Sequence, residues 1–143
     1  NQNKLRDYID EKDINFESEK IKFISSAERT DNCPFNLQGN CKFYSGEYSY
    51  KGELEVLIVP YTMTINTFMN NAKKTYSNLS AGDWMGKDYY VYIRGDDLLI
   101  FWYSNGKMIF IEREPYDTTK ENDYLEEFLT VYLNKYPSEL NLN

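Results

Sequence analysis

The dipeptide Asn105-Gly106 lies between two runs of strand-forming residues and restricts the fold more than any other short segment. Both central positions of a type I′ turn need positive φ, which Asn and Gly tolerate best, so the pair predicts a two-residue β-hairpin. A turn of this length also sets the register of the two strands. We therefore expect four cross-strand pairs: Ser104 with Lys107, Tyr103 with Met108, Trp102 with Ile109 and Phe101 with Phe110.

The segments before this hairpin also have strand-like patterns. Residues 89–93 alternate and lead through a polar turn into the hairpin, which predicts a three-stranded antiparallel meander. Nearer the N-terminus, residues 20–27, 42–50 and 53–59 are predicted as strands, and the last two form a second hairpin. Pro60 ends that hairpin, because proline has no amide hydrogen for the sheet ladder.

Two segments, residues 65–76 and 121–136, repeat apolar residues with helical spacing. Thr64 is a suitable N-cap for the first helix, and Pro137 ends the second. The predicted order is β-β-β-α-β-β-β-α. It corresponds to an α+β fold in which a mainly antiparallel sheet of five to six strands is packed with two amphipathic helices. The pattern leaves open whether the helices share one face of the sheet.

A chain of 143 residues has the usual length of one domain, so we expect a single globular domain over 1–143. Residues 1–18 are mostly polar, with Leu5, Tyr8 and Ile9 at helical spacing, and fit either a packed arm or a short helix. The sequence begins at Asn1 with polar residues, as it would after a removed signal peptide or an upstream anchor.

Cys33 and Cys41 are the two cysteines of the chain, and Pro34 and Gly39 bend the segment between them. The bend predicts a disulfide that closes a short loop, with two free thiols or half of a metal site as alternatives. A zinc site fits poorly, because the spacing is too wide and the chain has no histidine. Since disulfides persist in oxidising compartments, the cysteines favour an extracytoplasmic location, secreted or at the cell surface.

The absence of histidine excludes Ser-His-Asp and Cys-His catalysis as well as imidazole metal ligation. The chain has no glycine-rich phosphate loop and no calcium loop, so we predict no metal and no cofactor. A net charge of -7 disfavours nucleic-acid binding. Carboxylate pairs such as Glu53/Glu55 and Glu112/Glu114 are expected on the solvated surface of so acidic a chain. We therefore assign no catalytic residue and favour a protein that is not an enzyme.

Aromatic residues make up 17% of the chain, and many lie on or beside predicted strands. If both helices cover one face of the sheet, the other face would display aromatic rings suited to binding a protein or another ligand. The competing interpretation is that the same rings are core residues and cross-strand pairs. The candidate ligand-binding residues are Trp84, Tyr90, Tyr92, Trp102 and Tyr103.

Three functions are compatible with these observations. The first is a non-enzymatic extracytoplasmic domain, secreted or membrane-anchored, that binds a protein or other ligand through an aromatic sheet face. The second is an acidic intracellular inhibitor or immunity-type protein that masks a basic site, and the third is a carboxylate-dependent enzyme. No apolar run approaches the roughly 20 residues needed to cross a bilayer. The sequence specifies neither the partner nor the oligomeric state.

Overall fold

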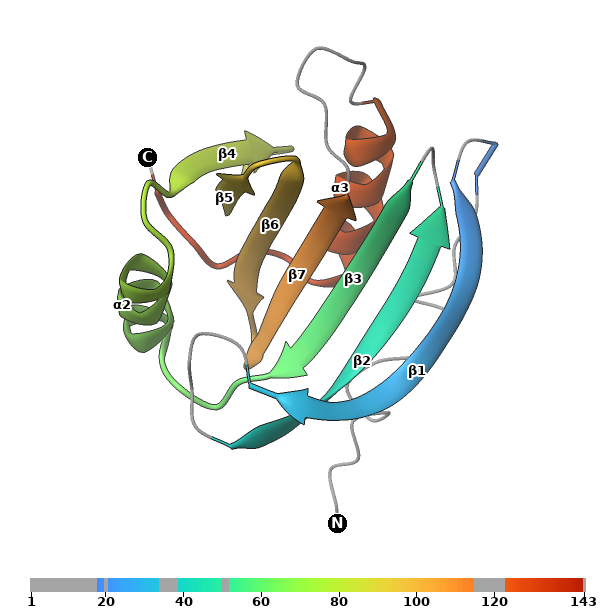
Figure 1. Ribbon diagram of the computed structural model, residues 1–143. Coiled ribbons are helices and arrows are strands. Elements are labelled where there is room, and N and C mark those ends of the chain that lie inside the picture. Colours follow the sequence, from blue (N-terminus) through green and yellow to red (C-terminus); the bar gives the residue numbers. More distant parts are fainter. Residues whose placement is uncertain (1–17, 20, 34–38, 50–51, 115–122, 143) are drawn as a thin grey trace.

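The computed structural model describes residues 18–19, 21–33, 39–49, 52–114 and 123–142, which form seven strands and two helices (Figure 1). Residues 1–17, for which an arm or a short helix was predicted, lie outside the described residues. In chain order the elements are β1 (Lys22–Asn32), β2 (Asn40–Ser49), β3 (Glu53–Pro60), α2 (Ile65–Thr75), β4 (Ser80–Trp84), β5 (Lys87–Arg94), β6 (Asp97–Ser104), β7 (Lys107–Glu114) and α3 (Asp123–Lys135).

All seven strands belong to one antiparallel sheet with the order β1-β2-β3-β7-β6-β5-β4. Strands β1 to β3 form one meander, and strands β4 to β7 form another. The two meanders join where β3 pairs with β7, with Val56 opposite Ile111. The α+β class, the antiparallel sheet and the two helices are as predicted, but the sheet has seven strands instead of five to six.

The β6–β7 hairpin has the register that the sequence predicts. All four expected pairs form, from Ser104 opposite Lys107 to Phe101 opposite Phe110. Asn105 has φ of 43° and Gly106 has φ of 75°, as a type I′ turn requires. The turn chemistry of two residues therefore sets the pairing of two whole strands.

Strand β4 is absent from the sequence-based prediction, which places no element between the helix at residues 65–76 and the strand at residues 89–93. Its five residues, SAGDW, show no apolar alternation, and the strand lies at the edge of the sheet. A second two-residue turn at Met85-Gly86, with both φ values positive, brings β4 onto β5. The ring of Tyr89 packs directly over Gly82, where an added Cβ would collide with it. Backbone pairing and this close approach form the strand without an apolar pattern.

The helix α2 begins and packs as its sequence indicates. The Thr64 hydroxyl accepts a hydrogen bond from the Thr67 amide at 3.2 Å, which caps the first turn. Phe68 and Ala72 are fully buried. The ring of Phe68 lies 6.1 Å from that of Phe101 on β6. The helix therefore packs on the side of the sheet that carries Phe101.

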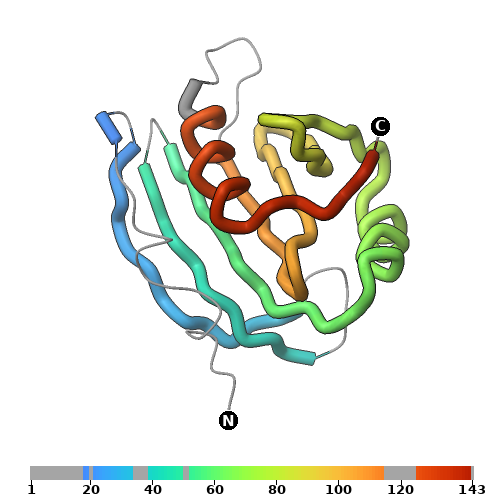
Figure 2. The backbone as a smooth tube through the Cα atoms, turned by 180° about the vertical axis from the view of Figure 1, so that it is seen from behind, coloured from blue at the N-terminus to red at the C-terminus, as the bar shows by residue number. Residues whose placement is uncertain are grey.

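The helix α3 packs on the opposite side of the sheet (Figure 2). The hydroxyls of Tyr48 on β2 and Tyr132 on α3 are hydrogen-bonded at 2.6 Å in the core. Phe128 packs against Tyr48 with ring centroids 4.8 Å apart. The helices therefore take opposite faces, a question that the sequence left open. Neither helix of the described residues has the length and apolar character needed to span a membrane.

Candidate functional site

The five aromatic candidates do not form one surface. Trp84 and Trp102 point to the α3 side, where their indole N–H groups donate to Thr130 Oγ1 at 2.9 Å and to the Tyr136 carbonyl at 2.7 Å. Strand alternation places Tyr90, Tyr92 and Tyr103 on the α2 side. Trp102 and Tyr90 are buried, with 0% and 5% of their surface exposed. Trp84, Tyr92 and Tyr103 are half-buried.

The fold instead gathers carboxylates on the α2 side of the central strands. Here Glu47 on β2 lies opposite Glu55 on β3, and Glu55 lies opposite Glu112 on β7. In the next row of the same face, Glu53 lies opposite Glu114. We call this surface the acidic face and define it by six residues: Glu47, Glu53, Glu55, Asp97, Glu112 and Glu114.

The sequence shows the pairs Glu53/Glu55 and Glu112/Glu114 but cannot show that they meet. The structure brings them together because β3 and β7 are neighbours in the sheet. Like charges directly opposite each other on a sheet are unfavourable, so their placement here carries an electrostatic cost. Only a signal for the β3–β7 pairing could have identified this surface beforehand.

The carboxyl group of Glu112 titrates well above its ordinary range. Partial burial, followed by the negative charge of Glu55 and then those of Asp97 and Glu114, raises the pKa of Glu112 to about 7. Glu112 is nevertheless an exposed residue, and water at its carboxyl group weakens the effect of burial. We therefore regard the adjacent carboxylates as the decisive cause.

Glu55 is the hydrogen-bond partner of Glu112 across the two strands. Burial raises the pKa of Glu55, while the Arg29 guanidinium, whose Nη1 lies 3.3 Å from Glu55 Oε2, opposes the increase. In the protonated pair Glu112 donates to the Glu55 carboxylate, because the neighbouring guanidinium favours the ionised form of Glu55. The two groups thus share one proton up to nearly neutral pH.

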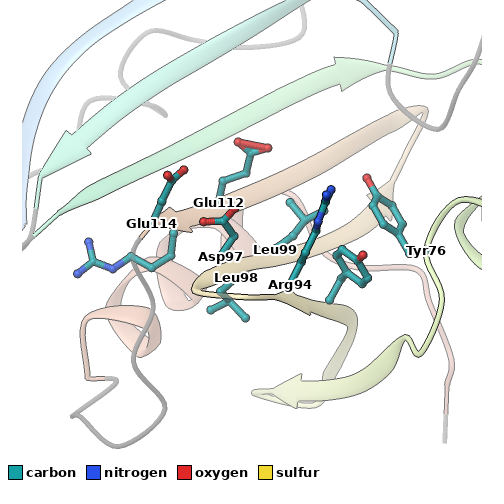
Figure 3. A pocket seen from close by; sticks show the side chains of 9 residues that line it. Tyr76, Arg94, Asp97, Leu98, Leu99, Glu112 and Glu114 are labelled. Atoms are coloured by element: carbon teal, nitrogen blue, oxygen red, sulfur yellow. The ribbon is translucent and has the colours of Figure 1, made fainter.

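A pocket of about 180 Å³ adjoins the acidic face where β5, β6 and β7 meet the segment after α2 (Figure 3). In Figure 3 the side chains of Arg94, Asp97 and Glu112 point to the same side of the strands. Tyr92 is the one predicted aromatic candidate that lines it. The lining residues are Tyr76, Tyr92, Arg94, Asp97, Leu98, Leu99, Glu112, Arg113 and Glu114.

The raised pKa of Glu112 predicts a pH dependence of stability that Glu112→Gln should reduce. Between about pH 4.5 and pH 7 the unfolded chain loses this proton while the folded chain keeps it, so the free energy of unfolding falls as the pH rises. The variant should therefore lose less stability than the original protein between pH 5 and pH 8. Urea unfolding at a series of pH values measures this, with Glu126→Gln on α3 as the matched control. Equal pH dependence in Glu112→Gln and the original protein would contradict the assignment.

The predicted disulfide between Cys33 and Cys41 is present, with the Cα atoms 5.0 Å apart. The Cys33 amide donates to the Gly39 carbonyl at 3.2 Å, which helps to close the loop. Residues 34–38 within the loop lie outside the described residues. In the described part of the chain, no group of three or more His, Cys, Asp or Glu side chains is placed to hold a metal ion.

The sequence matches no protein family and no curated protein. The fold is similar to that in the crystal structure of a GTP binding regulator from Thermotoga maritima, with a TM-score of 0.53. The alignment covers 84% of this chain and 80% of that chain, at 10% sequence identity. At this identity the likeness concerns the fold alone.

Proposed function

We propose that this chain is a non-enzymatic extracytoplasmic domain that binds a basic segment of a protein partner through the acidic face. The observation that carries the proposal is the convergence of six carboxylates from β2, β3, β6 and β7 on one side of the sheet. Two guanidiniums flank them, Arg29 on β1 and Arg94 on β5. The surface therefore keeps an excess of negative charge that complements a cationic partner.

Exposure supports the choice of this surface. Glu47, Glu53 and Glu114 are exposed, and neither described helix covers the middle strands on this side (Figure 1). Residues 1–17 contain five acidic and three basic residues, so their charge does not complement the acidic face. A basic segment of another protein is the occupant that this charge distribution favours.

The disulfide supports the extracytoplasmic part of the proposal, because disulfides persist in oxidising compartments. An intracellular inhibitor that masks a basic site would use the same acidic face, so the state of the cysteines in the natural protein separates the two functions. Glycoside hydrolysis is not supported, since it needs carboxylates separated by roughly 5–10 Å across a groove. Glu55 and Glu112 are instead hydrogen-bonded neighbours on adjacent strands.

The proposal is tested with a fluorescent ten-residue peptide of alternating lysine and serine. The triple variant Glu47→Gln, Glu53→Gln, Glu55→Gln should bind it about tenfold more weakly, the combined effect of losing two exposed carboxylates and one half-buried carboxylate. Amide chemical-shift changes in the original protein should concentrate on β2, β3 and β7. Binding should weaken as salt is added, because exposed charges are screened.

A second triple variant, Glu28→Gln, Asp83→Asn, Glu126→Gln, is the matched control. It has the same net charge as the first triple variant, but the exposed acidic residues that it changes lie on β1, β4 and α3. We expect it to bind the peptide within about twofold of the original protein, because screening limits the contribution of distant charges. Equal losses in both triple variants would overturn the proposal, since net charge alone would then explain the binding.

A further inference from the structure

The pocket beside the acidic face combines aromatic walls with a carboxylate rim. The rings of Tyr76 and Tyr92 lie 4.7 Å apart between centroids, inclined at 46°. Glu112 from β7 and Asp97 from β6 line the same pocket. Leu99 lies opposite Glu112 on the neighbouring strand β6, two residues after Asp97. Burial and the charge of Glu112 raise the pKa of Tyr76 to about 12, so its ring stays neutral at physiological pH.

This combination of aromatic rings and carboxylates favours a cation. Of the two arginines that line the pocket, Arg113 donates to the Glu53 carbonyl, and Arg94 is considered below. The face of a tyrosine ring attracts an ammonium or guanidinium group, and adjacent carboxylates add hydrogen-bond acceptors of opposite charge. The pocket, at about 180 Å³, is smaller than the roughly 300–1,000 Å³ of sites for whole small molecules. The volume of the pocket suits the end of one long side chain, and the carboxylates at the pocket favour a basic side chain.

We propose that the pocket accepts a single basic side chain, lysine or arginine, of the partner that binds the acidic face. This inference rests on the proposed function, of which it specifies one subsite. The side chain places its apolar stem against Leu99 and its positive charge between Tyr92 and Glu112. Binding to Glu112 displaces the proton that it shares with Glu55, so the pocket takes up the cation more strongly above pH 7.

Arg94 provides a test that distinguishes a cation-binding pocket from a pocket with only a structural role, because removing its charge should change cation affinity in a defined direction. Its side chain is exposed and lies over the same rim as Asp97 and Glu112 in Figure 3. The Arg94 guanidinium therefore competes with an incoming cation for these carboxylates. Removing its charge in Arg94→Gln should strengthen the binding of a cation and weaken the binding of an anion.

The experiment is an NMR titration at pH 8 with Nα-acetyl-lysine-N-methylamide, its arginine analogue and the neutral norleucine analogue. Both cations should shift the amides around residues 76, 92, 99 and 112, with dissociation constants on the order of millimolar, and the norleucine analogue should not. Tyr92→Leu should weaken cation binding roughly two- to fivefold, the range of an exposed cation–π contact. Glu112→Gln should weaken it by a similar factor, Arg94→Gln should strengthen it, and Glu126→Gln on α3 should leave it unchanged.

The outcomes separate the two proposals. If the lysine-serine peptide binds as proposed but neither cation shifts the pocket amides, the subsite is wrong and the acidic face stands. If the cations bind but both triple variants bind the peptide equally, the subsite stands and the proposed function fails. Equal binding of the norleucine analogue, or weaker cation binding in Arg94→Gln, would overturn the assignment of charge to the pocket. The pattern of amide signals in each variant verifies that the fold is intact.

Discussion

Trp102→Ala is expected to lower the free energy of unfolding by about 3–5 kcal/mol, the range for removing a large buried aromatic ring. Trp102 has none of its surface exposed. Its indole N–H donates to the Tyr136 carbonyl at 2.7 Å, which ties β6 to the segment just after α3. The substitution leaves a cavity beneath α3 and an unsatisfied carbonyl group at the same point. Urea unfolding followed by circular dichroism measures the loss, and Trp84 remains as an independent fluorescence probe.

Two further variants separate the contributions of Trp102. Trp102→Phe keeps most of the apolar ring but removes the donor, so it should cost less, about 1–3 kcal/mol. Trp84→Ala should also cost less than Trp102→Ala, because Trp84 is only half-buried. If Trp102→Ala unfolded at the same urea concentration as the original protein but lost peptide binding, Trp102 would be a ligand-contacting residue instead of a core residue.

The double substitution Cys33→Ser, Cys41→Ser is expected to lower the free energy of unfolding by about 2–3 kcal/mol. The two cysteines are 8 positions apart, and the disulfide removes the conformational freedom of this loop from the unfolded chain. The loop connects β1 to β2, so its release affects the edge of the sheet. Unfolding of the oxidised protein and of the variant under identical conditions measures the difference.

Thiol titration in denaturant is the control for this prediction. Protein from its natural cells should show no free thiol before reduction and two after it, since Cys33 and Cys41 are paired. Addition of a reductant to the oxidised protein should reproduce the stability of the double variant. Two free thiols in the natural protein would contradict the extracytoplasmic proposal and favour the intracellular inhibitor.

The elements that the sequence predicted depend on residues close together in the chain. Asn105-Gly106 gave the β6–β7 register because positive φ at two positions dictates the turn. Thr64 and the buried residues Phe68 and Ala72 predicted α2 through a cap and one apolar face. The disulfide was likewise predicted from nearby residues, because the segment between the two cysteines is short and contains Pro34 and Gly39. The edge strand β4 was missed because backbone pairing, and not an apolar pattern, forms it.

By itself, the sequence determined the order of the two helices and of six of the seven strands, and the register of the β6–β7 hairpin. The absence of histidine from the sequence also excluded histidine-dependent catalysis. Only the tertiary structure decided that β3 pairs with β7 and that the helices lie on opposite faces. Those two facts place Glu55 beside Glu112 and bury Trp102. The candidate binding surface that follows from the structure is therefore acidic, whereas the sequence suggested an aromatic one. The physical reason is distance along the chain. Turns and helical faces arise from residues close together in the sequence, whereas the pairing of β3 with β7 depends on how segments far apart in the sequence share one core.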